Sequence, residues 1–223
     1  MPTRPLLAFE LAHAQARDAV HAVFDPATVT DALNGPAAIT VHSRAPDRAT
    51  YLQRPDLGRR LREEDLPALS RATMDRPDVA IVVADGLSAT AVHSHAAPTL
   101  LALCERLSGW RVAPIVLARQ ARVALGDEIG AALDVDAVVV LIGERPGLSA
   151  PDSLGAYVTW APRLGRRDSE RNCVSNIRPP HGLAHAEAAD EIARILIAAR
   201  RMRLTGVALN ASLLAQPDAA ADG

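Results

Sequence analysis

Two short apolar runs in the sequence each end in residues that could bind a ligand. The run at residues 79–84 (VAIVVA) is followed by the segment 85–88 (DGLS), and the run at 137–142 (AVVVLI) is followed by the segment 143–147 (GERPG). Continuous β-branched runs that stop at turn residues are typical of buried, parallel strands. In open α/β sheets, ligands bind beyond the carboxyl ends of such strands. Both segments are therefore candidates for a binding site.

Glu144 and Arg145 lie directly after the second run. A carboxylate accepts hydrogen bonds, so Glu144 suits the amide N–H groups or ribose hydroxyls of a ligand better than a phosphate. The alternative is a surface pair, but the position at the end of a strand favours a site. The segment 85–88 has two interpretations that the sequence leaves open. It is either a helix start capped by Ser88, with Gly86 in an unusual backbone conformation, or the edge of a ligand site.

The other reactive side chains do not form a recognisable catalytic set. His93 and His95 stand at positions i and i+2, which on a helix point in different directions. His181 and His185 have an i,i+4 spacing, but two prolines precede them and no acidic third ligand is placed beside them. Cys173 is expected to be a small buried side chain, because no base is positioned to activate it as a nucleophile.

The composition narrows the possible functions. The chain has 223 residues, 49% hydrophobic content and a net charge of −2, which favours neither nucleic acid nor a membrane as a partner. All 24 basic side chains are arginine, so a phosphate-loop lysine and a Schiff-base lysine are both excluded. Two cysteines do not make a disulfide framework, and no apolar run is long enough to span a bilayer. A reduced cytosolic location is the default expectation.

The core of the chain is predicted to be an α/β fold. Strands at 79–84, 112–117 and 137–142 alternate with a helix from Ser88 to about residue 107 and a helix over 126–133. This order favours a right-handed βαβαβ unit. The sequence of the second helix (GDEIG at its start) does not match the glycine fingerprint of dinucleotide-binding proteins.

The flanking segments are predicted to complete this fold. Pro98 is expected to kink or divide the helix that contains it. The remaining expected elements are an amphipathic helix over 6–23, an irregular polar stretch over 41–51, a short helix from Asp56, strands at 155–160 and 173–177, a helix over 184–202 and a frayed tail after Ala211.

Together these patterns predict a doubly wound parallel sheet preceded by a small helical N-terminal segment. Such a domain would have a polar crevice beyond its strands but no self-sufficient catalytic set. That combination suggests a subunit that holds a cofactor.

At these residues the sequence resembles a known family, the small (light) subunit of the adenosylcobalamin-dependent enzyme ethanolamine ammonia-lyase. The resemblance runs from about residue 5 to about residue 206. Its most specific segments are 142–148 (IGERPGL) and 173–177 (CVSNI), which occur in this order. The other matching segments are 9–21 (FELAHAQARDAVH), 43–45 (SRA), 47–51 (DRATY), 54–58 (RPDLG), 85–89 (DGLSA) and 122–124 (RVA).

The resemblance implies a Rossmann-like fold and a role in binding cobalamin. In this family the large subunit is a TIM barrel that binds ethanolamine and hosts the radical chemistry, which yields acetaldehyde and ammonia. The small subunit closes over the cobalamin at the interface of the hetero-oligomer. The family's cobalamin contacts carry over to Val123, Glu144 and Cys173, and no residue of the small subunit is implied to be catalytic.

The resemblance also implies how the chain is divided and how it holds its cofactor. Residues 1–75 would form the N-terminal helical segment for subunit contacts, and residues 76–223 the Rossmann-like cobalamin-binding domain. The sequence lacks a D-x-H-x-x-G motif, which agrees with base-on adenosylcobalamin, in which no protein histidine replaces the lower ligand.

Localisation and two alternative functions complete the expectations. Family members usually carry an extra N-terminal segment, associated with assembly and with packing into a bacterial microcompartment. In this sequence Met1 stands almost at the first expected helix, so the expected location is a bacterial microcompartment or the cytoplasm. One alternative is a nucleotide-binding oxidoreductase subunit on the same fold, against which the missing glycine fingerprint argues. The other is a purely structural partner of a large subunit, against which the polar crevice residues argue.

Overall fold

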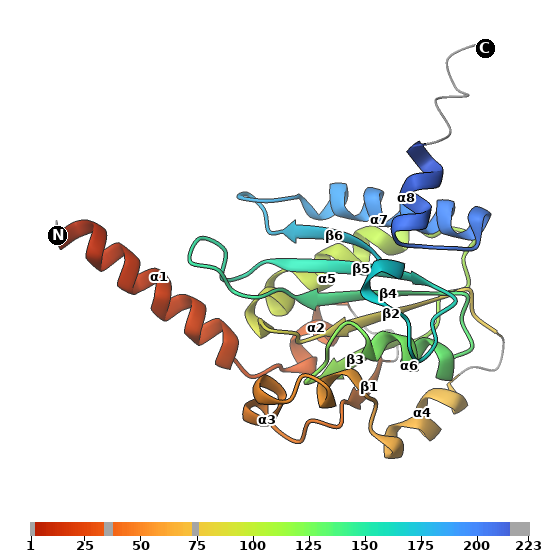
Figure 1. Ribbon diagram of the computed structural model, residues 1–223, viewed down its shortest axis with the longest axis horizontal. Helices are drawn as coiled ribbons and strands as arrows, with labels where there is room; N and C mark the ends of the chain where they lie inside the picture. The colour runs from red at the N-terminus through yellow and green to blue at the C-terminus, as the bar shows by residue number, and fades with distance from the viewer. Residues whose placement is uncertain (1–2, 34–37, 73–75, 215–223) are drawn as a thin grey trace, which may run out of the picture.

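The fold is α/β, with a six-stranded mixed sheet in the order β1-β3-β2-β4-β5-β6 (Figure 1). The computed structural model describes residues 3–33, 38–72 and 76–214. The strands are β1 (Ala38–His42), β2 (Val79–Ala84), β3 (Ile115–Arg119), β4 (Ala137–Gly143), β5 (Leu154–Trp160) and β6 (Asn172–Ile177). The α-helices are α1 (Thr3–His21), α2 (Pro26–Ala32), α3 (Arg48–Gln53), α4 (Leu66–Arg71), α5 (Ala89–Arg106), α6 (Leu125–Ala132), α7 (His185–Met202) and α8 (Val207–Leu214). Short 3-10 helices are η1 (Leu57–Arg59), η2 (Glu63–Asp65) and η3 (Asp168–Glu170).

The sheet is parallel on one side and antiparallel on the other. β1, β3, β2 and β4 run parallel, whereas β5 pairs antiparallel with β4 and β6 pairs antiparallel with β5. The prediction of a wholly parallel sheet is therefore wrong for the last two strands. A parallel connection needs a crossover of about a dozen residues or more, usually a helix. Residues 144–153 and 161–171 join these strands without an α-helix.

Helices cover both faces of the sheet, and a separate apolar core lies under each group. α5 and α7 pack on one face over side chains such as Ile81, Val139 and Leu141. α6 packs on the other face over alternating positions such as Val82, Val138 and Val140. The central strands β2 and β4 are buried at every position, which explains why their sequences are continuously apolar.

The segment before β2 contributes a strand to the sheet, which the sequence pattern did not predict. β1 pairs in parallel with β3 along its whole length, and α3 follows it. The expectation of an irregular stretch over 41–51 therefore holds only for residues 43–47, between these two elements. Asp47 accepts a hydrogen bond from the Thr50 backbone N–H at 2.8 Å and caps α3. The short helix expected from Asp56 is η1, and Asp56 makes no side-chain cap there.

The helix that follows β2 begins as predicted. The Ser88 Oγ accepts from the Ala91 N–H at 3.2 Å and donates to the Pro151 carbonyl at 2.9 Å. α5 continues through Pro98 as a single helix, so the proline does not divide it. At the other end of the chain, α8 includes Ala211, and residues 215–223 of the expected frayed tail lie outside the described residues.

The first helix projects from the body of the molecule (Figure 1). Ala19 is its one buried residue, and Leu7, Phe9 and Leu11 expose 59%, 54% and 60% of their surface. Within the described ranges, no helix has the length and hydropathy needed to cross a membrane.

Candidate functional site

A half-open pocket of about 420 Å³ lies beyond the carboxyl ends of β2, β3 and β4. This is the place at which open α/β sheets bind their ligands. The pocket brings together Val123 and Glu144, two of the three residues singled out from the sequence. Its lining consists of Tyr51, Gly86, Leu87, Arg122, Val123, Ile142, Gly143, Glu144, Arg145 and Tyr157.

The floor of the pocket is formed by two turns whose backbones are in direct contact. Gly86 has a φ of +56°, and a Cβ there would lie 2.2 Å from the Gly143 carbonyl oxygen. A Cβ on Gly143 would lie 2.1 Å from the Ser88 carbonyl oxygen. Only glycine fits at both positions. The segment 85–88 is therefore both a helix start and part of the pocket, since Ser88 caps α5 while Gly86 and Leu87 line the pocket.

Asp85, which precedes this turn, has a structural role. Its carboxylate is buried and accepts from the backbone N–H groups of Gln120 and Ala121, each at 2.9 Å. The Arg48 Nη1 lies 3.7 Å away. Burial raises the pKa of Asp85, and the two backbone hydrogen bonds oppose that rise. The bonds tie the end of β2 to the loop after β3 and so fix the position of the next pocket residues.

Glu144 is held in place by hydrogen bonds from the neighbouring antiparallel strands. The Ser153 hydroxyl donates to Oε2 and the Ser175 hydroxyl to Oε1. The Asn176 backbone N–H donates to Oε2 at 3.3 Å. A Cβ on Gly155 would lie 2.8 Å from Oε1, so the carboxylate lies directly over β5. Carboxylate oxygens have about four acceptor positions in total, so Glu144 retains capacity for a ligand donor.

Cys173 lies beside the pocket rather than in its lining. It is the direct partner of Tyr157 across the β5–β6 ladder, and Tyr157 lines the pocket. The expectation that Cys173 is buried is wrong, because it lies on the outward face of β6 and is exposed. Desolvation around the sulfur raises the pKa of the thiol, the Tyr157 hydroxyl bond lowers it and the Glu144 charge raises it further. Cys173 therefore remains a neutral thiol at neutral pH.

Arg122 and Tyr51 also line the pocket and were not singled out as site residues from the sequence. The Arg122 guanidinium carbon lies 4.4 Å from the centroid of the Tyr51 ring, a distance suited to a cation–π contact. The Tyr51 hydroxyl donates to the Ala121 carbonyl at 3.0 Å. The chain has only two tyrosines, and both line the pocket. The rarity of tyrosine, and the place of Arg122 and Tyr51 in segments that resemble the family, were the signals in the sequence that could have marked them.

The histidines lie away from the pocket lining. His93 accepts from the Asp25 backbone N–H at 3.0 Å, while His95 points toward α7, where its Nδ1 lies 3.1 Å from the Nε2 of His185. Burial lowers the pKa of both His95 and His185. The spacing in the sequence did not predict that these two histidines, on different helices, form a pair.

The fold and the pocket define an α/β protein with a candidate ligand site at the carboxyl edge of its sheet. Residues 1–210 match the family model described as ethanolamine ammonia-lyase light chain (EutC). The chain is 53% identical to the ethanolamine ammonia-lyase small subunit of Ralstonia nicotianae, over 94% of this chain and 80% of that protein. The corresponding protein of Azotobacter vinelandii is 54% identical, with 94% and 80% covered. The chain belongs to the family of ethanolamine ammonia-lyase small subunits.

Proposed function

We propose that this small subunit closes an adenosylcobalamin site at its interface with the catalytic large subunit of ethanolamine ammonia-lyase. The complex would convert ethanolamine to acetaldehyde and ammonia by radical chemistry. The observation that carries the proposal is the pocket at the carboxyl edge, which brings Val123 and Glu144 together and has Cys173 at its rim. When bound, the cobalamin supplies the cobalt–carbon bond whose cleavage starts a radical reaction.

The polar groups around the pocket suit the amide fringe of a corrinoid, which we propose is bound base-on. The corrin ring is fringed by amide groups, whose N–H groups Glu144 can accept and whose carbonyls arginine side chains can bind. The Arg122 Nε–H is buried and has no acceptor among the described residues, so the site has a donor that a ligand would satisfy. The pocket is half-open and smaller than a corrinoid, which leaves part of the ligand for a partner to cover.

The residues of this chain would bind and orient the cofactor rather than react. Glu144 is fixed by Ser153 and Ser175, so it accepts from the ligand without reorganising. Val123 lies in the turn before α6 and presents a small apolar surface to the pocket. Cys173 is a neutral thiol that serves as a contact at the rim. Leu87 and Ile142, which also line the pocket, would help to exclude water from the cofactor.

The N-terminal segment is the proposed surface for the large subunit. We propose that residues 1–75 provide subunit contacts and that residues 76–223 act as a Rossmann-like cobalamin-binding unit, although β1 joins the two through the sheet. Arg48 links the exposed helix to the pocket, because its Nε donates to the Val20 carbonyl at 2.7 Å and its Nη1 donates to the Gly86 carbonyl at 2.8 Å. Docking of α1 would therefore be transmitted to the pocket floor. The assembled enzyme is proposed to reside in a bacterial microcompartment or the cytoplasm.

Reconstitution tests the proposed function directly. The chain is co-expressed with a candidate large subunit, and the purified complex is assayed for acetaldehyde with and without adenosylcobalamin. We expect activity only from the complex and only with the cofactor. Acetaldehyde formation by this chain alone with adenosylcobalamin would overturn the division of labour. The absorbance spectrum of the complex distinguishes bound cobalamin from a nicotinamide, a flavin or no cofactor.

A paired substitution tests the role of α1. Replacing Leu7 and Leu11 by Glu removes apolar side chains that are exposed in this chain. We expect co-purification with the large subunit to fall sharply while the melting temperature of the isolated chain changes little, because neither side chain supports the core. The same replacement at exposed Leu164, on the β5–β6 connection, serves as the control. Unchanged co-purification would show that α1 is not part of the interface.

A further inference from the structure

The pocket contains two arginines whose hydrogen-bonding capacity is largely unused. The Nε of Arg122 is buried without an acceptor among the described residues. Its Nη2 reaches only the Tyr51 carbonyl, at 3.5 Å, the outer limit of a hydrogen bond. Arg145 is exposed and forms no ion pair or hydrogen bond with the described part of the chain. A guanidinium carries five donors in a planar fork, so both side chains are prepared to bind an additional acceptor.

The charge around the pocket points to an anionic group. Arg122 and Arg145 contribute two positive charges to the lining, and Glu144 contributes one negative charge. That carboxylate already accepts hydrogen bonds from the Ser153 and Ser175 hydroxyls. In the described part of the chain, no ion pair joins Glu144 to either arginine. The cation–π contact of Arg122 with the Tyr51 ring at 4.4 Å restrains the guanidinium, and a planar fork of donors suits an oxyanion with two acceptor oxygens.

We propose that Arg122 and Arg145 bind the phosphodiester of the nucleotide tail of cobalamin. This inference rests on the proposed function and deepens it, because the phosphodiester is the anionic group of a base-on cobalamin, whereas the corrin amides are uncharged. The two arginines then recognise the tail, and Glu144 accepts from the amide fringe.

Two corrinoids that differ in the tail test this assignment. Cyanocobalamin has the nucleotide tail and its phosphodiester, and cobinamide lacks both. Their dissociation constants are measured by absorbance titration of the purified two-subunit complex, in the wild type and in the variants Arg122→Met and Arg145→Gln. Methionine retains most of the apolar stem that lies on Tyr51. Arg163→Gln, an exposed arginine on the β5–β6 connection, is the matched control.

Selective weakening is the expected result. Loss of one charge-assisted contact should weaken cyanocobalamin binding about tenfold to a hundredfold, with cobinamide binding changed less than threefold and Arg163→Gln without effect. Arg145→Gln should show the same selectivity, and because this side chain is exposed, misfolding would not explain its effect. Equal weakening of both corrinoids, or no change in either, would overturn the assignment while leaving the cobalamin role intact. A wild-type complex that binds neither corrinoid would overturn both.

Discussion

Two clusters of charged side chains lie beside the sheet. They differ in whether their charged groups have hydrogen-bond partners within the chain. Near the amino end of β4, Arg171 donates to Asp127 through two hydrogen bonds of 2.6 and 2.7 Å, with both side chains almost fully buried. The Arg171 Nη1 also donates to the Thr159 hydroxyl at 2.9 Å. At the carboxyl ends, Arg122 and Arg145 lack comparable partners among the described residues.

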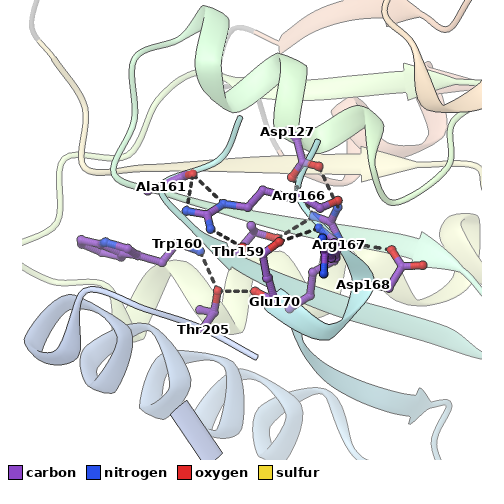
Figure 2. Close-up of polar contacts among 10 residues, drawn as sticks. Asp127, Thr159, Trp160, Ala161, Arg166, Arg167, Asp168, Glu170 and Thr205 are labelled. Atoms are coloured by element: carbon purple, nitrogen blue, oxygen red, sulfur yellow. Dashed lines mark hydrogen bonds and ion pairs between the residues drawn. The ribbon is translucent and has the colours of Figure 1, made fainter. Parts of the chain in front are cut away.

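The hydrogen bonds around the two clusters differ in the same way. Next to Arg171, Thr205 accepts from the Trp160 N–H at 3.0 Å and donates to the Glu170 carbonyl at 2.6 Å (Figure 2). This closed network joins α6, the last two strands and the segment before α8. The pocket at the carboxyl edge is instead half-open and holds donors without acceptors. Charged groups that are satisfied internally stabilise the fold, whereas charged groups left unsatisfied beside a cavity are available to a ligand.

The largest expected effect is the loss of stability when the buried Arg171–Asp127 pair is broken. Arg171→Met leaves Asp127 buried without its partner, and removal of one member of a buried pair costs about 3–5 kcal/mol. We expect the free energy of unfolding of the chain in urea to fall by that amount. The double variant Asp127→Leu, Arg171→Met should recover most of the loss, because no charge remains buried.

An exposed ion pair provides the control for this prediction. Arg59 and Asp168 lie 3.7 Å apart with more than half of each side chain exposed. Arg59→Gln should change the free energy of unfolding by less than about 1 kcal/mol. If Arg171→Met were no more destabilising than Arg59→Gln, the interpretation of the closed cluster as structural would be wrong.

Glu144→Gln should have a smaller effect, on cofactor binding more than on stability. The substitution keeps the shape of the side chain but removes its charge, and loss of a charge-assisted hydrogen bond costs about 1.5–3 kcal/mol. The dissociation constant for cobalamin should rise about tenfold to a hundredfold. Ser153→Ala removes one donor to Glu144 and should raise the dissociation constant less than Glu144→Gln does. Unfolding in urea should show that Glu144→Gln destabilises the chain less than Arg171→Met.

Substitution of Cys173 by serine should have a still smaller effect on binding. Serine fits the same position on β6 and can replace the thiol in its contact with Tyr157. Turnover by the complex should persist, with at most a modest rise in the dissociation constant of the cofactor. Cys173→Trp, by contrast, should prevent binding by filling the rim of the pocket. Loss of turnover in the serine variant with cobalamin still bound would indicate a chemical role for the thiol.

The smallest expected effect concerns the rate at which Cys173 is alkylated. Its pKa is raised, so the thiolate fraction at any given pH is lower than that of an ordinary cysteine. Alkylation by iodoacetamide, followed by mass spectrometry of the tryptic peptide, should be slow at neutral pH and accelerate only at distinctly alkaline pH. Cobalamin bound to the complex should slow it further. Rapid alkylation at neutral pH would contradict the assignment of a neutral thiol.

The sequence predicted best those elements whose pattern is determined locally. β2 and β4 are buried on both faces, so their composition alone identified them, and the Ser88 cap of α5 was visible from a side chain next to a helix start. β1 lies at the edge of the sheet and is only partly buried, so it has no continuous apolar run. The antiparallel direction of β5 and β6 depends on short connections, which strand composition does not report.

The candidate site was predicted only where a residue's position follows from the local sequence. Glu144 follows a strand directly, so its place at the pocket could be predicted from the position of that strand. Arg122 and Tyr51 come from distant parts of the chain and meet only through packing, at 4.4 Å. The Arg171–Asp127 pair was missed because its members are 44 positions apart. Pairing across such distances is a property of the tertiary structure.

Equilibrium binding of cobalamin to the assembled complex is the most direct test of whether the carboxyl-edge pocket holds the cofactor. The dissociation constant of cyanocobalamin is measured for complexes of the large subunit with wild-type chain, with Glu144→Gln and with Arg171→Met. We expect Glu144→Gln to weaken binding at least about tenfold, whereas folded complex carrying Arg171→Met should bind as the wild type does. Equal affinity of the wild-type and Glu144→Gln complexes would contradict the claim that the carboxyl-edge pocket holds the cofactor.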